Sequence, residues 1–436
     1  MTAPALALKP LPLRGSATSG VVAPASDSIR LAGEHFAAAI LYLVAGTVGL
    51  VWIAPDLAAG AYLSPHVAGV THLFTLGWLT TTILGALYQL LPVALGAPVR
   101  SKLVGHLSFW ALAPGAGLFA CGVASGITML HHSGLALVGT GVLLAVGNIG
   151  STLPRARSRD VTWAAIAIAL SFLLSTLVLG MILLHNLHTG FIADARIRVL
   201  ATHLHVALVG WALIMMVGVS HRLLPMFLLA HDADTRWTRR SLALLSSGVV
   251  ALGFGLVARV GLLTWLGALL LDAGVACFLW QAHAFYKVRV RKKIDVGMRF
   301  AAFALSFLAM SALLGSTLLL AGASQMQLAT AYVVVGLLGG IVLFVIGFFY
   351  KIVPLLAWTA RYRGRMGKGP VPTVAQMYSS RVAHGQLALM ALGVTLLAIG
   401  IGTGSPHVAR CGAVLWAGGV LLFVSQIGRV ALGGQS

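Results

Sequence analysis

Histidine is the residue type whose placement in this sequence points most directly to chemistry. Residues 201–230 are apolar and long enough to cross a bilayer, yet they contain His203, His205 and His221. An ionisable side chain inside a membrane-spanning helix is energetically costly, so its presence there indicates a functional site. Neutral imidazole is the commonest protein ligand of metal ions and an axial ligand of haem iron. The stretch therefore predicts a metal or haem site within a membrane.

Two further stretches have the same pattern as residues 201–230. Residues 70–93 share with them a Gly-Trp pair, a later glycine and a terminal Leu-Leu-Pro, all at the same spacing. Residues 330–355 keep the later glycine and the proline. The stretches recur about every 130 residues, which predicts three copies of one structural unit. Pro92 is expected to end its helix, because proline lacks a backbone donor.

This register makes His72 equivalent to His205, and Tyr88 equivalent to His221. Residues two apart on an α-helix point about 200° apart, so His203 and His205 are expected to face different neighbours. His221 lies roughly 24 Å further along the helix at 1.5 Å per residue, too far to join them. Its equivalence to Tyr88 favours a packing or hydrogen-bonding role for both residues.

The composition excludes a soluble protein. Hydrophobic residues make up 59 % of the chain and charged residues only 9 %, whereas soluble domains are about one quarter charged. Apolar runs of about 20 residues recur throughout, as in polytopic α-helical membrane proteins. Twelve spans are expected, near residues 33–54, 67–92, 103–125, 134–152, 161–185, 200–228, 241–258, 261–285, 299–321, 327–356, 383–402 and 408–428.

These spans divide into three units of four. We expect a disordered cytosolic tail at residues 1–32, because this segment is polar and rich in proline, alanine and serine. The three repeats then comprise residues 33–160, 161–298 and 299–436. The predicted fold is an all-α membrane protein of twelve helices with pseudo-threefold symmetry, in which the second span of each unit is innermost.

The net charge of +20 reflects how the chain is oriented in the membrane and does not indicate nucleic-acid binding. Of the 29 Lys and Arg residues, only Arg196, Arg198, Arg259 and Arg410 fall on the side of the odd-numbered connections. The positive-inside rule then places both termini in the cytoplasm of a bacterial-type inner membrane. The basic loops are expected to contact anionic lipid headgroups of the bilayer.

Nine histidines fall on the outer side in this topology, and this clustering strengthens the prediction of a site. The nine are His66, His72, His131, His132, His185, His188, His203, His205 and His407. His72 and His205 are candidate ligands of a haem b or, with His203 and the loop residues His185 and His188, of copper. Asp272, the acid expected deepest in the membrane, should be buried in protein or beside a cavity.

Twelve helices in three four-helix arcs, with histidines on the second helix of an arc, resemble subunit I of the haem–copper oxidases. The pattern is also similar to the NnrS family, twelve-span proteins linked to nitric-oxide stress and to haem and copper binding. The resemblance in architecture covers about 400 residues; that in motif is limited to spans 2, 6 and 10. It implies a haem ligand at His72 and a copper ligand at His205 or His203.

The sequence departs from the oxidase pattern at two required places. The seventh span has no histidine pair, and Val334 stands where the tenth span should carry its His-x-His motif. The resemblance therefore implies a relative that does not reduce oxygen and that acts in electron transfer or in nitric-oxide or copper handling. A periplasmic electron donor or other membrane subunits would be its partners.

Two other functions fit the sequence. The first is a transporter or channel that uses Asp272, since proline-broken helices in repeats occur in that class. The second is a structural membrane subunit. Whether the protein is an enzyme is left open by the residues themselves.

Overall fold

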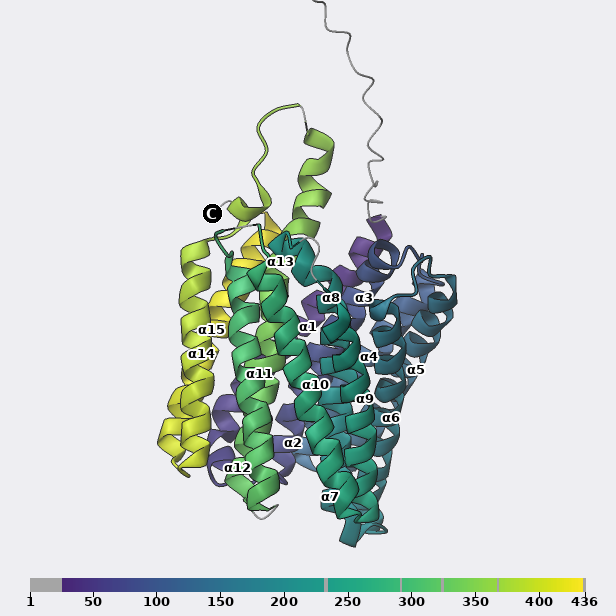
Figure 1. Cartoon of the computed structure of the whole chain (residues 1–436), viewed down its shortest axis with the longest axis vertical. Coiled ribbons are helices and arrows are strands. Elements are labelled where there is room, and N and C mark those ends of the chain that lie inside the picture. The colour runs from purple at the N-terminus through teal and green to yellow at the C-terminus, as the bar shows by residue number, and fades with distance from the viewer. Residues whose placement is uncertain (1–25, 231–233, 291, 323–324, 367, 434–436) are drawn as a thin grey trace, which may run out of the picture.

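The computed structural model describes residues 26–230, 234–290, 292–322, 325–366 and 368–433. Of these residues 87 % are helical, and none of them lies in a strand. In the described part of the chain, twelve helical spans are long and apolar enough to cross a membrane, as the sequence predicts. They run up and down in one bundle. The first residues of α1 and the last residues of α15 lie at the same end of this bundle (Figure 1). We call this end the α1 end.

Nine spans are built of one main helix each. They are α1 (Ser26–Ala58), α4 (Lys102–Ser125), α5 (Thr128–Thr152), α6 (Val161–Thr189), α9 (Arg236–Ala258), α10 (Gly261–Lys287), α11 (Val296–Ala321), α14 (Ser380–Gly402) and α15 (Pro406–Leu432). Of the tail expected at residues 1–32, residues 1–25 lie outside the described residues, and α1 already begins at Ser26.

The other three spans are composite, each with an eight-residue π-helical segment between two α-helices. They are α2 (Pro65–His72), η1 (Leu73–Thr80) and α3 (Thr81–Ala94); α7 (Arg196–His205), η4 (Val206–Leu213) and α8 (Ile214–Leu228); and α12 (Met326–Val334), η5 (Val335–Val342) and α13 (Leu343–Tyr362). The π segments follow directly after His72, His205 and Val334, which the sequence register made equivalent. Single π turns inside α-helices are frequent at functional sites.

The composite spans are also the innermost ones. Buried residues make up 61 %, 56 % and 78 % of their most apolar stretches, against 50 % or less in every other span. They meet at the centre, where Trp78 stacks on Phe349 at a ring-centroid distance of 4.9 Å. There the indole of Trp211 donates to the hydroxyl of Thr80 at 3.2 Å.

In chain order the twelve spans can be taken in groups of four, with a composite span second in each group. Glycines in the π segments allow the first span of each group to approach the composite span closely. A Cβ on Gly77 would lie 2.4 Å from the ring of Tyr42, a residue of α1. The equivalent glycines, Gly210 and Gly339, meet the rings of Phe172 and Phe307 in the same way, at 2.6 Å. These contacts need a residue without a side chain, since no real Cβ fits at such distances.

The third and fourth spans of each group form close antiparallel hairpins, namely α4–α5, α9–α10 and α14–α15. Each hairpin is tied by a buried carboxamide on its fourth span: Asn148, Gln281 or Gln426. Asn148 accepts from the backbone N–H of Ser101 at 3.0 Å and donates to its carbonyl at 2.8 Å. Gln281 and Gln426 bond the backbone at the start of α9 and α14.

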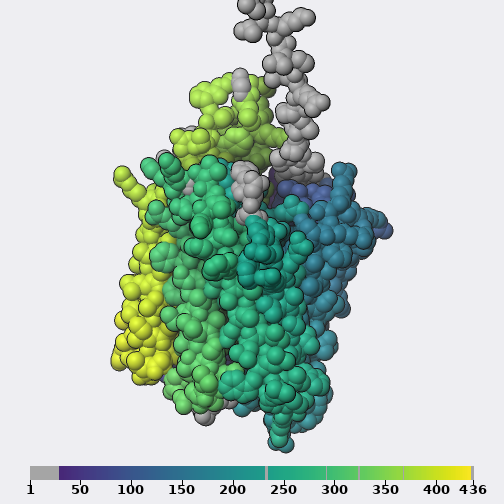
Figure 2. Space-filling model, in the orientation of Figure 1, coloured from purple at the N-terminus to yellow at the C-terminus, as the bar shows by residue number. Residues whose placement is uncertain are grey.

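Contacts between groups close the bundle into a ring. The fourth span of one group packs on the first span of the next: α5 on α6, α10 on α11, and α15 on α1. The far end of α13 projects beyond the other helices at the α1 end (Figures 1 and 2).

The three prolines lie at different distances from the ends of their helices. Pro92 and Pro225 lie within the last turn of α3 and α8, but α13 continues past Pro354 to Tyr362. Helices in membrane proteins tolerate proline, because neighbouring groups satisfy the freed carbonyl.

Candidate functional site

His72 and His205 hold the same local geometry at the ends of α2 and α7. Nδ1 of His72 donates to the Ala68 carbonyl at 2.7 Å, and Nδ1 of His205 donates to the Ala201 carbonyl at 2.8 Å. A carbonyl only accepts, so these bonds fix the proton on Nδ1 and leave the Nε2 lone pair of each neutral ring for another partner. Metal-ligating histidines are oriented by such bonds.

His72 and His203 lie on different composite spans and are near enough to interact electrostatically. The ring of His203 lies beside α6, 3.4 Å from the Cβ position of Gly180. The ring of Phe119 packs edge-on against His72 at 5.0 Å. No hydrogen bond or ring contact joins His72 to His205 in the part of the chain that the structure describes.

His203 carries a buried nitrogen without a proper partner. Its Nδ1 has no hydrogen bond of normal geometry among the described residues, although the ring interacts with the Thr176 carbonyl. A buried polar atom without a partner costs free energy, about 1–3 kcal/mol. Together, His72 and His203 present two imidazoles from different composite spans, one with Nε2 available and one with Nδ1 unpaired.

His205 faces a different partner, on the composite span that lacks a histidine. The hydroxyl of Tyr332 lies 3.2 Å from Nε2 of His205. Both residues line a cavity of about 340 Å³ between α7, α9, α10, α11 and α12, whose other walls are mainly aliphatic.

As expected, Asp272 lies beside this cavity. Its carboxylate accepts from the hydroxyl of Ser316 at 2.6 Å. Asp272 is also close enough to Tyr332 to interact with it electrostatically. The lining of this cavity is mainly aliphatic, and two pairs of polar side chains interact within it, Asp272–Ser316 and Tyr332–His205.

His221 and Tyr88 lie apart from these groups, towards the α1 end. Nδ1 of His221 is 3.3 Å from the hydroxyl of Thr238, at the start of α9. Tyr88 is fully buried, with His35 edge-on at 5.5 Å and Ser108 of α4 nearby. These contacts agree with a packing or hydrogen-bonding role.

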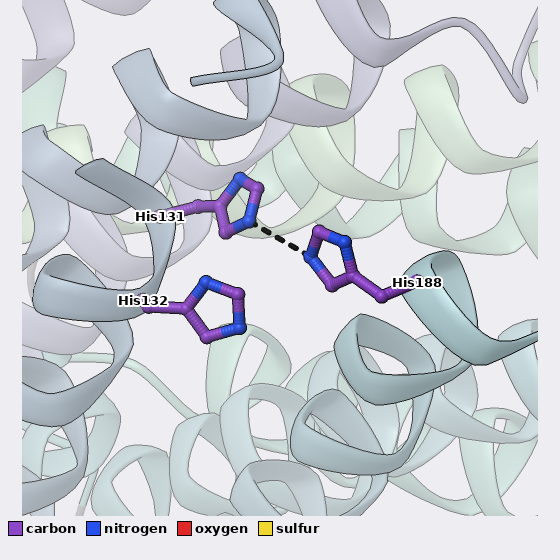
Figure 3. Close-up of side chains that lie close together, drawn as sticks. All are labelled: His131, His132 and His188. Atoms are coloured by element: carbon purple, nitrogen blue, oxygen red, sulfur yellow. Dashed lines mark hydrogen bonds between the residues drawn. The ribbon is translucent and has the colours of Figure 1, made fainter. Parts of the chain in front are cut away.

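A third group of histidines lies at the end of the bundle opposite the α1 end, where α5 begins and α6 finishes. Ligand nitrogens of His131, His132 and His188 all lie within 4.8 Å of one another (Figure 3). His185, which the sequence analysis grouped with His188, instead packs on Phe191 at 5.2 Å. His188 therefore joins His131 and His132, and not His203 or His205.

This trio was not predicted, although the expected topology puts all three residues on the outer side. The sequence contains one hint of it: His131 and His132 open the fourth span, and His188 ends the fifth, which is the next span along the chain. Consecutive spans joined by one loop are usually neighbours, but only the packing of α5 on α6 shows which faces meet.

No family model matches the sequence, and no curated protein matches it either. The site residues are therefore interpreted from their own geometry.

Proposed function

We propose that this chain is a multi-pass membrane protein that binds a transition-metal ion, copper in the first place, through His72 and His203. The observation that carries this proposal is that these two imidazoles, on different composite spans, are near enough to interact electrostatically, while the buried Nδ1 of His203 has no hydrogen bond of normal geometry. An ion between the rings would satisfy that nitrogen. Two neutral imidazoles suit copper, which would supply one-electron chemistry when bound.

The fit for a haem held by His72 and His205 is poorer. A six-coordinate iron needs two imidazoles that face the same centre from opposite sides. Here Nε2 of His205 is turned to Tyr332, while His72 has His203 and Phe119 as neighbours. We therefore assign His72 and His203 to the metal and give His205 the role of a cavity residue.

We further propose that the bundle consists of three copies of one four-helix unit, in the pseudo-threefold plan of oxidase subunit I. The support lies in equivalent contacts at equivalent positions: a π segment in each composite span, a carboxamide on each fourth span and a ring-to-glycine contact at each first span. The packing of α5 on α6, α10 on α11 and α15 on α1 is also what a closed ring of three units requires.

The proposed orientation puts the α1 end in the cytoplasm of a bacterial-type inner membrane. Basic residues gather at this end, both in the connections and at the helix ends beside them, including Arg155, Arg159, Arg239 and Arg361. His72 and His203 then lie towards the periplasm, where a soluble electron donor could reach them. In a background without Cys121, Cys277 and Cys411, we expect labelling of Gly190→Cys from outside and of Ser158→Cys only after permeabilisation. Reversed labelling would contradict this orientation.

A second candidate function is transport or conduction of a small molecule or proton through Asp272. The cavity of about 340 Å³ with its Asp272–Ser316 pair is the observation that favours it. A third, purely structural role predicts no bound metal and no transport.

The decisive experiment is metal analysis and a visible spectrum of the full chain, purified through a tag without histidine. With the trio of outer histidines disabled by His132→Asn and His188→Asn, we expect copper in amounts near one per chain, lost in His72→Ala and in His203→Ala. His221→Ala is the matched control and should retain it, because His221 bonds Thr238 near the other end of its span. A haem spectrum that is lost in both His72→Ala and His205→Ala would reject our assignment. Absence of both metal and haem would favour transport.

A further inference from the structure

Three imidazoles meet at the end of the bundle opposite the α1 end, on the hairpin helix α5 and on α6. His131 is buried and His132 and His188 are exposed, so one ligand is anchored in the protein and two are reachable from water. We propose that His131, His132 and His188 bind a first-row transition-metal ion of the copper or zinc type. This site shares no residue with the His72–His203 pair and is independent of the function proposed above.

The distances suit a metal with only small side-chain movements. Nε2 of His131 and Nε2 of His188 are 3.1 Å apart (Figure 3). Metal–imidazole bonds of about 2.0–2.1 Å span this separation at a ligand–metal–ligand angle of about 100°, close to tetrahedral. The nitrogens of the three rings lie within 4.8 Å of one another, so His132 needs a shift of its ring and not of its helix.

Backbone carbonyls prepare two of the rings for ligation. Nδ1 of His132 donates to the Thr128 carbonyl at 2.9 Å, which leaves its Nε2 as the ligand atom. Nδ1 of His131 is buried and lies beside the Gly122 carbonyl without a hydrogen bond of normal geometry. A metal-bound histidine usually directs its other nitrogen at such an acceptor.

A simple hydrogen bond between His131 and His188 is the competing explanation, but it leaves two features unexplained. It does not require His132, whose ring also lies against both others, at 4.7 and 5.0 Å. It also does not explain a histidine at position 131. Gly122 packs on the backbone of His131 as Gly255 packs on Thr264 and Gly400 packs on Ala409. Small residues therefore suffice for this helix contact.

The donor set defines the class of ion. All three ligands are imidazoles, with no carboxylate or thiolate in the group. Imidazole favours copper, zinc and nickel over magnesium and calcium, which take oxygen ligands. Three protein ligands leave a fourth position for water or an exchanging ligand. With two exposed ligands, the ion can enter and leave from the aqueous phase.

The test uses the full chain with the inner site removed by His72→Ala and His203→Ala, stripped with chelator and titrated with Zn²⁺ and with copper. We expect one ion per chain and an X-ray absorption signal of three imidazole ligands. His132→Asn and His188→Asn should each weaken binding on the order of tenfold or more. His185→Asn, on the same helix as His188 but packed on Phe191, is the matched control and should bind as the parent does.

Three results would overturn the proposal. The first is binding of neither metal by the folded parent protein, and the second is an equal loss of affinity in His185→Asn and His188→Asn. The third concerns His131. His131→Thr removes the buried ligand and keeps the close helix contact, because Gly255 packs on Thr264 as Gly122 packs on His131. It should abolish binding while the helical content stays unchanged, and retained binding in this variant would also reject the site. Failure here leaves the copper content attributed to His72 and His203 untouched, because that is measured separately.

Discussion

The hydroxyl of Tyr332 donates to Nε2 of His205 at 3.2 Å, since Nδ1 of that ring is already bonded to the Ala201 carbonyl. The composite span without a histidine thus contributes a partner for the histidine of its neighbour. Tyr332→Phe should lower the free energy of unfolding in mixed micelles by about 1 kcal/mol, the usual net value of one hydrogen bond. In a His205→Ala background the same change should cost clearly less. Equal costs in both backgrounds would mean that the bond does not couple the two spans.

Gly77→Ala tests the close approach of α1 to the first π segment. The new Cβ would overlap the ring of Tyr42, so we expect destabilisation by about 1–3 kcal/mol, as for overpacked cores. Gly147→Ala is the matched control, because this helical glycine has nothing within 4 Å of its Cβ position. Alanine there should be neutral or stabilising. Equal stability of the two variants would show that the contact is not tight.

Asn148→Ala removes two hydrogen bonds that hold the start of α4. We expect faster hydrogen–deuterium exchange at residues 101–105 and a cost of about 1–3 kcal/mol, because backbone groups lose buried partners. Asn148→Asp should have a smaller effect, since its oxygen can still accept from the Ser101 N–H. Unchanged exchange in the alanine variant would contradict a bracing role.

Asp272→Asn keeps an oxygen that can accept from Ser316, so we expect normal expression, folding and metal content. Asp272→Leu should cost little stability, because the Ser316 hydroxyl can still donate to the Ala312 carbonyl at 3.1 Å. Proton uptake by proteoliposomes with a pH-sensitive dye separates the two functions. Our proposal expects no difference between wild type and Asp272→Asn. A flux in wild type that Asp272→Asn abolishes would favour the transport function instead.

Much of the architecture could be predicted because it follows from local chemistry. Apolar runs gave the twelve spans, and the shared glycine spacing aligned His72 with His205, the two positions that directly precede π segments. The π segments themselves have no distinct sequence signature, so they were not predicted. The carboxamide bonds were also missed, because Asn148 and Ser101 are brought together only by the hairpin.

The candidate site was harder to predict than the fold. Which histidines meet depends on how each helix is rotated about its axis. On a π segment, or next to one, side chains point in other directions than regular α-helical geometry predicts. His203 and His205 do face different neighbours, as two residues on one helix must. The partners, however, are His72 for the first and Tyr332 for the second. Similarly, His188 meets His131 and not His205, because α6 turns that face to α5.

The packing of α15 on α1 has a consequence for synthesis. The chain leaves the ribosome from its amino end, so α1 enters the bilayer well before its neighbour α15 does. Each hairpin can close as soon as it is made, since its two helices are adjacent in sequence. The α1 surface that will receive α15 must meanwhile be covered by lipid or by an insertion factor. Chains that stop before α15 would keep that surface open, which makes them natural substrates for membrane quality control.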